Sequence, residues 1–158
     1  MKILLAIDGS RFGDEAVRFC EDLFGPHENA EIKVLSVIQR LAPLGAAAAA
    51  GAAPYYSQMQ NFSVDQAKEF VGKAAGALRE ALSGKGFEIT EEVLTGSISR
   101  EIVRTAEEWG ADLVVVGSHG YGYWERTLLG SVSDSVVHLA PCSVLIVRFP
   151  GEPPATEE

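Results

Sequence analysis

Short apolar runs alternate with amphipathic segments along the whole chain. The apolar runs cover residues 3–7, 32–38, 113–116 and 143–148, and residues 87–94 form a fifth run that is polar at alternate positions. Runs of this length predict β-strands, whereas apolar residues that recur every three or four positions predict amphipathic helices. The pattern therefore predicts five strands separated by helices.

The expected helices are defined by their apolar stripes. The second stripe runs from Ala67 to Leu82, and the third runs from Ile98 to Trp109, before Gly110. Glycine commonly follows the end of a helix, which agrees with that boundary. Two further helices are defined in the same way by apolar side chains at helical spacing: Ala16, Val17, Cys20, Leu23 and Phe24 in the first, and Val132, Val136 and Leu139 in the last.

This alternation predicts one α/β domain with an open five-stranded parallel sheet and helices on both faces, a Rossmann-like arrangement. The length of 158 residues also favours a single domain. In such sheets ligands bind beyond the carboxyl ends of the strands, where the strand order reverses. Asp8, Val37 and Gly117 stand at three such ends. We therefore expect them to line one crevice.

Two segments lack a regular pattern. Residues 40–60 contain an Ala/Gly-rich stretch at 42–53, where glycine and proline interrupt the helical tendency of alanine, so we expect a flexible loop whose role the sequence does not define. Residues 150–158 are rich in proline and glutamate and are expected to form a disordered acidic tail. The folded domain is thus expected to span residues 1–149.

Charge and cysteine content limit the possible functions. The formal net charge is −9, which argues against binding to nucleic acids or to anionic membranes. The first apolar run is too short for a signal peptide and ends at Asp8. Cys20 and Cys142 lie far apart without metal-ligand spacing, so we expect two buried or half-buried thiols in a reducing compartment. We expect a soluble cytoplasmic protein.

A glycine-rich segment carries the clearest chemical signal. Gly117, His119 and Gly120 follow the strand at 113–116, and Gly130-Ser131 open the next helix nine residues after Gly120. Glycines between a strand and a helix let backbone amides approach phosphate oxygens. The segment therefore predicts a nucleotide site, although a structural turn without a ligand is the simpler alternative.

For three residues in or near this segment, a role in the protein's own structure is an alternative to contact with a ligand. Ser131 with Asp134 also fits a capping box, and a carboxylate there would be unfavourable beside a phosphate. Asp8 is either a ligand contact or a helix N-cap. His119 is either a phosphate donor or an ordinary loop residue, and no paired carboxylate or nucleophile supports a catalytic role for it.

With these residues noted, the chain resembles the universal stress protein family, specifically its ATP-binding branch. The branch motif is Gly, two residues, Gly, nine residues, Gly and then Ser or Thr, and Gly117, Gly120, Gly130 and Ser131 match it in full. The resemblance covers nearly the whole chain, from the opening strand with Asp8-Gly9-Ser10 to the last strand. A full motif between a strand and a helix is specific, unlike two glycines alone.

The resemblance implies an adenine-nucleotide-alpha-hydrolase-like fold, a bound ATP or related adenine nucleotide, possible Mg²⁺ carried by the phosphates, and a homodimer. The dimer would form through the last strand, Val144–Val147. Asp8 would contact the adenosine moiety, and the backbone of Val37 would meet the adenine. Ribose and phosphates would follow Gly117, His119 and Gly120, and amides and hydroxyls would hold the phosphate oxygens at Gly130, Ser131, Val132 and Ser133. Ala6 and Val116 complete the expected site.

Several functions fit this fold. We expect a nucleotide-dependent regulatory or stress-response protein with an unknown protein partner and at most slow ATP hydrolysis, because no base, metal cluster or Walker lysine is evident. The alternatives are a nucleotide-independent dimeric stress adaptor and a nucleotide hydrolase or transferase. A phospho-acceptor signalling domain is excluded, because Thr95-Gly96 and Arg148 stand where it would need an aspartate and a lysine.

Overall fold

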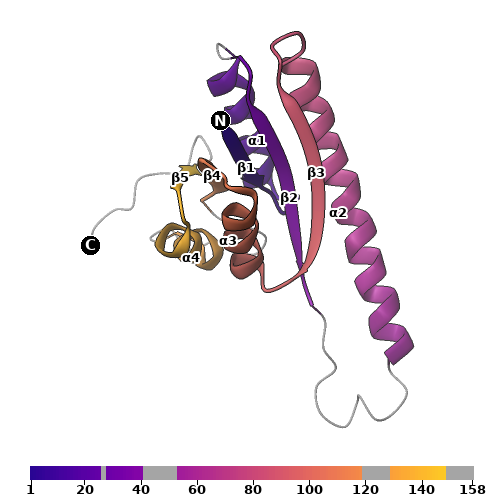
Figure 1. Cartoon of the computed structure of the whole chain (residues 1–158). Coiled ribbons are helices and arrows are strands. Elements are labelled where there is room, and N and C mark those ends of the chain that lie inside the picture. The colour runs from indigo at the N-terminus through magenta and orange to yellow at the C-terminus, as the bar shows by residue number, and fades with distance from the viewer. Residues whose placement is uncertain (26–27, 41–52, 119–128, 149–158) are drawn as a thin grey trace, which may run out of the picture.

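The computed structural model describes residues 1–25, 28–40, 53–118 and 129–148. Its centre is a five-stranded sheet in the order β3-β2-β1-β4-β5 (Figure 1). Every pairing is parallel. The strands are β1 (Lys2–Ala6), β2 (Glu31–Gln39), β3 (Glu88–Gly96), β4 (Leu113–Gly117) and β5 (Ser143–Val147). The sequence-based prediction of an open five-stranded parallel sheet is confirmed.

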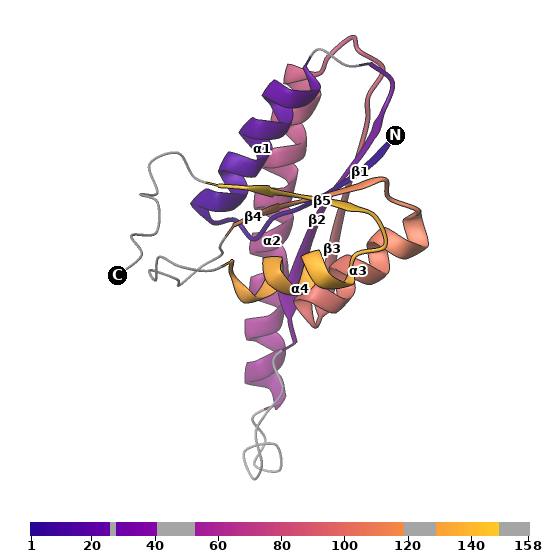
Figure 2. The ribbon, with the colours of Figure 1, turned by 90° about the vertical axis from the view of Figure 1, so that its left-hand side faces the viewer.

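The described helices cover both faces of the sheet, as the two views together show (Figures 1 and 2). One face packs against α1 (Arg11–Phe24) and α2 (Ala53–Ala81). The other packs against α3 (Ile98–Trp109) and α4 (Ser131–Leu139). None of the helices described is both long and apolar enough to cross a membrane.

The central strand, β1, shows how the sequence builds both layers. Leu4 and Leu5 are fully buried but belong to different apolar clusters, because successive side chains of a strand point to opposite faces. Leu5 joins the cluster under α1 and α2, and Leu4 joins the cluster under α3 and α4. An uninterrupted apolar strand is thus explained by burial on both sides.

The predicted bounds of the loop at residues 40–60 were wrong in detail. α2 begins at Ala53, so residues 53–60 are helical and not part of a loop, whereas residues 41–52 lie outside the described chain. Pro54 is compatible with a helix that begins at Ala53. The N–H groups of the first turn have no carbonyl partner within a helix, so a proline there, which lacks an N–H, removes no hydrogen bond. Leu23 and Leu139 belong to the apolar stripes of α1 and α4 but are 39% and 60% exposed, although Phe24, which follows Leu23, is buried.

The turn from β1 to α1 is held by local hydrogen bonds and by one close approach. Ser10 caps α1, and its hydroxyl accepts from the Gly13 amide, while the Asp8 carboxylate accepts from the Ser10 amide at 3.0 Å. Asp8 is therefore not the N-cap. Gly9 has a φ of +75° and lies against the ring of Phe70 on α2. This contact fixes the turn relative to the long helix.

Both thiols have the environments expected from the sequence. Cys20 is buried in α1 and Cys142 is half-buried, and neither forms a disulfide. Burial, with a smaller effect of Glu21, raises the pKa of Cys20 to about 12. Burial also raises the pKa of Cys142. Both groups therefore remain protonated at neutral pH, which makes them poor nucleophiles.

Candidate functional site

A cavity of about 320 Å³ opens at the carboxyl ends of β1 and β4. These two strands are neighbours, yet the chain leaves them toward opposite edges of the sheet, so a crevice forms between their connections. The cavity volume lies in the range typical of small-molecule sites. The strand order, and not any single loop, therefore determines where this site is.

Nine of the residues proposed from the sequence line this one cavity. They come from four separate segments of the chain: Ala6, Asp8, Val37, Val116, Gly117, Gly130, Ser131, Val132 and Ser133. The remaining two, His119 and Gly120, lie outside the described residues. The nine lining residues lie up to 127 positions apart in the sequence. Those at strand ends could be grouped in advance, because the carboxyl ends of parallel strands lie along one edge of the sheet.

The inner part of the cavity is apolar. Leu35 and Val37 of β2 and Val116 of β4 form one wall, and Ile98 and Ile102 of α3 form another. The two isoleucines were assigned from the sequence only to the core stripe of α3. Both isoleucines lie in the first turns of α3, which directly follow the carboxyl end of β3. This position in the sequence could have indicated that they line a site at the carboxyl edge of the sheet. This wall can accept a flat apolar group such as a heterocyclic base.

The outer part of the cavity is formed by the start of α4. The Gly130 amide donates to the Ser118 carbonyl at 2.9 Å, and the Gly130 carbonyl accepts from the Asp134 amide at the same distance. The helix leaves the first-turn amides of residues 131–133 without partners in its own hydrogen-bond ladder. Together with the helix dipole, these amides favour an anionic group.

Ser133 has a different role from the one predicted. Its hydroxyl donates to the Gly117 carbonyl at 2.6 Å, and the side chain is 4% exposed. The single hydroxyl hydrogen is therefore used inside the protein and does not reach a ligand oxygen. Ser133 fixes α4 against the end of β4, and only its backbone amide remains suitable for an anion.

The substitution Ser133→Ala tests this positioning role. It leaves the Gly117 carbonyl without its buried partner, so we expect a loss of about 1–2 kcal/mol in the free energy of unfolding. Equilibrium urea denaturation measures this loss. Ser135 is half-buried, but its hydroxyl donates to the Ser131 carbonyl one turn earlier in a solvent-exposed hydrogen bond. It gives the matched control Ser135→Ala, for which we expect a change below about 0.5 kcal/mol. Equal effects of both substitutions would contradict the assignment.

The capping box proposed for Ser131 and Asp134 does not form. The N-cap of α4 is Gly130, no side chain caps the helix, and Ser131 is its first residue. The motif fails because Gly130, held by Ser118, starts the helix one residue earlier. The exposed Asp134 carboxylate lies 3.8 Å from the His138 ring and does not line the cavity. The expected conflict between Asp134 and a phosphate is therefore absent.

Charges at the cavity are few. Asp8 is the one ionisable side chain among its described lining residues. Within the described ranges, no group of three or more His, Cys, Asp or Glu side chains is arranged to hold a metal ion. Positive potential for an anionic ligand would thus come from the first turn of α4 and not from a lysine or arginine of the described lining.

Comparison with known proteins gives a consistent result over nearly the whole chain. A family model for the universal stress protein family matches residues 1–148. Universal stress protein MJ0531 of Methanocaldococcus jannaschii is 32% identical over 149 residues, which cover 94% of this chain and 82% of the relative. Universal stress protein YxiE of Bacillus subtilis is 31% identical over 147 residues, with 93% and 98% covered.

Solved structures share the fold. The structure of MJ0577 from the same archaeon aligns with a TM-score of 0.79 at 25% identity, covering 95% of this chain and 96% of that one. A universal stress protein in complex with cAMP aligns at 0.62 and 24% identity, covering 94% and 96%. A family protein from Arabidopsis thaliana with AMP bound aligns at 0.68 and 17% identity, covering 99% and 97%. At these last two identities the likeness concerns the fold.

Proposed function

The chain belongs to the universal stress protein family, and we propose that it is a regulatory protein that binds ATP or another adenine nucleotide in the cavity between β1 and β4. The observation that carries the proposal is the meeting of Gly117, Gly130 and the first turn of α4 at one end of a cavity whose other end is apolar. The AMP-bound and cAMP-bound relatives support the choice of an adenine nucleotide.

Each part of the cavity suits one part of a nucleotide. The base would lie among Val37, Ile98 and Ile102, where burial of apolar surface stabilises a heterocycle. Phosphate oxygens would accept from the amides of residues 131–133. Asp8 would accept from a hydroxyl or amino group of the adenosine. Any Mg²⁺ would be carried by the phosphates, because the described residues offer no cluster for it.

We propose regulation rather than efficient catalysis. The described lining residues contain one carboxylate, Asp8, and no second acid or base beside it, so general acid–base catalysis has little support. Hydrolysis would then be slow, and bound nucleotide would instead shift a conformation that a protein partner reads. The alternatives are a nucleotide-independent adaptor and a hydrolase or transferase. The two free thiols agree with our proposal of a cytoplasmic protein.

A homodimer through β5 is part of the proposal. β5 is the last strand of the sheet, so one of its edges has no partner among the described strands. Val144, Leu145 and Ile146 are only partly buried in the single chain. An apolar edge of this kind is suited to pairing with its own copy across a two-fold axis. Sedimentation velocity at micromolar concentration tests this, and a monomer would contradict it.

Denaturation of the freshly purified protein, with chromatography and mass spectrometry of the released molecules, tests for bound nucleotide. Calorimetric titration of the stripped protein with ATP, ADP, AMP and cAMP then ranks the ligands. We expect binding of at least one of them in the micromolar range, about −8 kcal/mol. Absence of both released nucleotide and binding heat would favour the adaptor, and rapid steady-state turnover of ATP would favour the enzyme.

A further inference from the structure

The two outer strands of the sheet each have one edge without a partner among the described strands. β3 lies at one side of the sheet, beside α2, and β5 lies at the other (Figure 1). β3 is nine residues long and pairs with β2 along its whole length, whereas β5 has five residues. A long unpaired edge can take up a strand of another chain, and proteins commonly block such edges. A block is therefore expected at β3.

The direction of the backbone groups defines the free edge of β3. The Glu88 amide donates to the Ala30 carbonyl at 2.9 Å, so Glu88 turns its N–H and C=O toward β2. Successive residues of a strand in a parallel sheet turn these groups to alternate sides. Residues 89, 91, 93 and 95 therefore present their N–H and C=O groups away from β2. None of the described strands pairs with these groups.

Arg79 of α2 occupies the first part of this edge. Its Nη2 donates to the outward-facing carbonyl of Ile89 at 3.0 Å, and its Nη1 lies 2.8 Å from the carboxylate of Glu91. The guanidinium thus joins two consecutive outward-facing residues of β3. An added strand would need the same carbonyl as the acceptor for one of its own amides. Because both side chains of the ion pair remain partly exposed, the pair adds little stability, and its main consequence is an occupied edge.

β5 has no comparable block in the described part of the chain. The Ser118 amide donates to the Val147 carbonyl at 2.8 Å, so Val147 faces β4. By the same alternation, the backbone groups of Val144 and Ile146 face outward. No described side chain bonds to the backbone of these two residues, and β5 contains no charged residue. The two outer strands therefore differ in how open their edges are.

We propose that Arg79 closes the β3 edge against strand addition by a second copy of this chain. The residues of β3 alone do not prevent that pairing. A two-fold axis at Val93 would place Glu91 opposite Thr95 of the second copy, and no glutamate of β3 would lie opposite another. The segment that follows Thr95 in the second copy would then pass over Ile89, where the Arg79 guanidinium lies. Each interface of this kind would meet two such guanidinium groups.

Sedimentation velocity of Arg79→Ala tests the block. Removal of the guanidinium should strengthen self-association at least about tenfold over the wild type, with a new species of twice the wild-type mass. The proposed pairing through β5 rests on the proposed function, but the block on β3 does not. The new species is a dimer if the wild type is monomeric and a tetramer if the wild type already pairs through β5, so the two proposals fail separately.

Arg104→Ala is the matched control. It removes a similarly exposed, ion-paired arginine from α3 and leaves the β3 edge unchanged. It should associate as the wild type does, because charge alone does not close the edge. Unchanged association of Arg79→Ala, or an equal increase in both variants, would overturn the proposal. A clear fall in Tm of Arg79→Ala would show that Arg79 serves the fold instead and would also overturn it.

A proline at Val93 shows whether the new contact uses the β3 edge. The Val93 N–H faces outward, so a proline there removes no hydrogen bond to β2, and free strand edges tolerate proline. Val93→Pro added to Arg79→Ala should return self-association to the wild-type level. Association that persists in the folded double variant would run through another surface, which the proposal excludes.

Amide hydrogen exchange gives a second readout that needs no proline. In the wild type the outward-facing amides of residues 91, 93 and 95 should exchange rapidly, whereas the intervening amides, which face β2, should be protected. In the associated Arg79→Ala variant the exchange of the three outward-facing amides should slow about tenfold or more. Unchanged exchange at these three residues would show that β3 is not the pairing edge and would contradict the proposal.

Discussion

Gly130→Glu is expected to weaken adenine nucleotide binding by more than about 100-fold while the protein stays folded. Gly130 is the N-cap of α4 and lines the cavity beside the amides proposed to hold phosphate. A glutamate there places a carboxylate where phosphate oxygens would lie, and two anions at contact distance in a partly buried site repel each other strongly. Calorimetric titration with ATP measures the loss.

The fold should tolerate this substitution. Gly130 has a φ of −58° and a ψ of 151°, which any L-residue adopts, and it is only partly buried. Gly76→Glu is the matched control, because it makes the same change on α2 at a position where an added Cβ meets no atom within 4 Å. ATP affinity of Gly130→Glu within about threefold of this control would place the phosphates elsewhere.

The largest effect on stability is expected from Gly9→Ala, about 3 kcal/mol in the free energy of unfolding. A φ of +75° costs an L-residue about 1–2 kcal/mol. An added Cβ would also lie 2.7 Å from Cδ1 of Phe70, a half-buried ring that packs against the core cluster and would have to shift. Overlap of this kind costs about 1–3 kcal/mol. Equilibrium urea denaturation with circular dichroism measures the sum.

Gly84→Ala separates the two contributions. Gly84 has nearly the same φ, +76°, but an added Cβ there meets nothing within 4 Å. Only the backbone cost should remain, about 1–2 kcal/mol. If the two alanine variants lose equal stability, the contact between Gly9 and Phe70 contributes nothing. If the contact is real, Phe70→Leu should cost less in the Gly9→Ala background than in the wild type, because the smaller side chain relieves the overlap.

The parts of this molecule that the sequence predicts well are those set by short-range pattern and by general topology. Leu4 and Leu5 lie in a short apolar run, as expected of a strand that is buried on both faces. Asp8, Val37 and Gly117 could be grouped in advance because parallel strands end at one edge. The family followed from the same patterns and is confirmed by the match of the family model.

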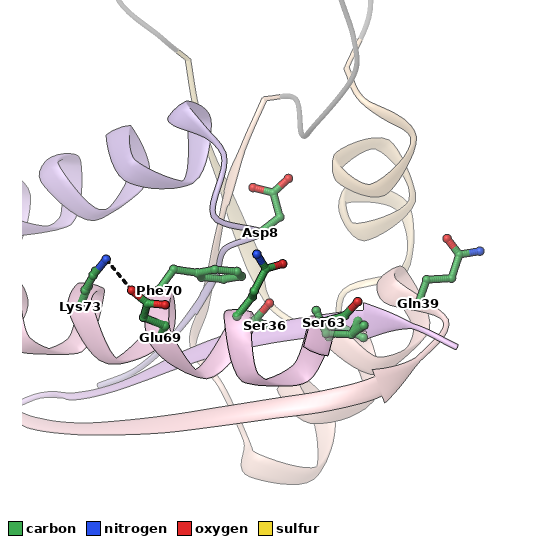
Figure 3. A pocket seen from close by; sticks show the side chains of 10 residues that line it. Asp8, Ser36, Gln39, Ser63, Glu69, Phe70 and Lys73 are labelled. Carbon is green, nitrogen blue, oxygen red and sulfur yellow. Dashed lines mark hydrogen bonds and ion pairs between the residues drawn. The ribbon is translucent and has the colours of Figure 1, made fainter. Parts of the chain in front are cut away.

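The parts that sequence reasoning missed depend on how elements approach each other. The hydroxyl of Ser133 donates to the carbonyl of Gly117, 16 residues away, and that contact depends on how α4 meets β4. A second cavity of about 580 Å³ lies between α2 and the carboxyl end of β2 (Figure 3). It was missed because the first turns of α2 were taken as a loop and because Ser36, which lines it, looked like an ordinary strand residue. Only the tertiary structure reveals that its hydroxyl is buried without a partner.

We propose that the cavity between β1 and β4 binds an adenine nucleotide through the start of α4, and two-dimensional NMR of the nitrogen-15-labelled protein during titration with ATP reports on each amide of that cavity. We expect the largest amide shifts at residues 131–133, which begin α4, and at Val37 beside the base. Absence of shifts, or shifts confined to the α2 face around Ser63 and Gln66, would show that ATP does not bind in this cavity.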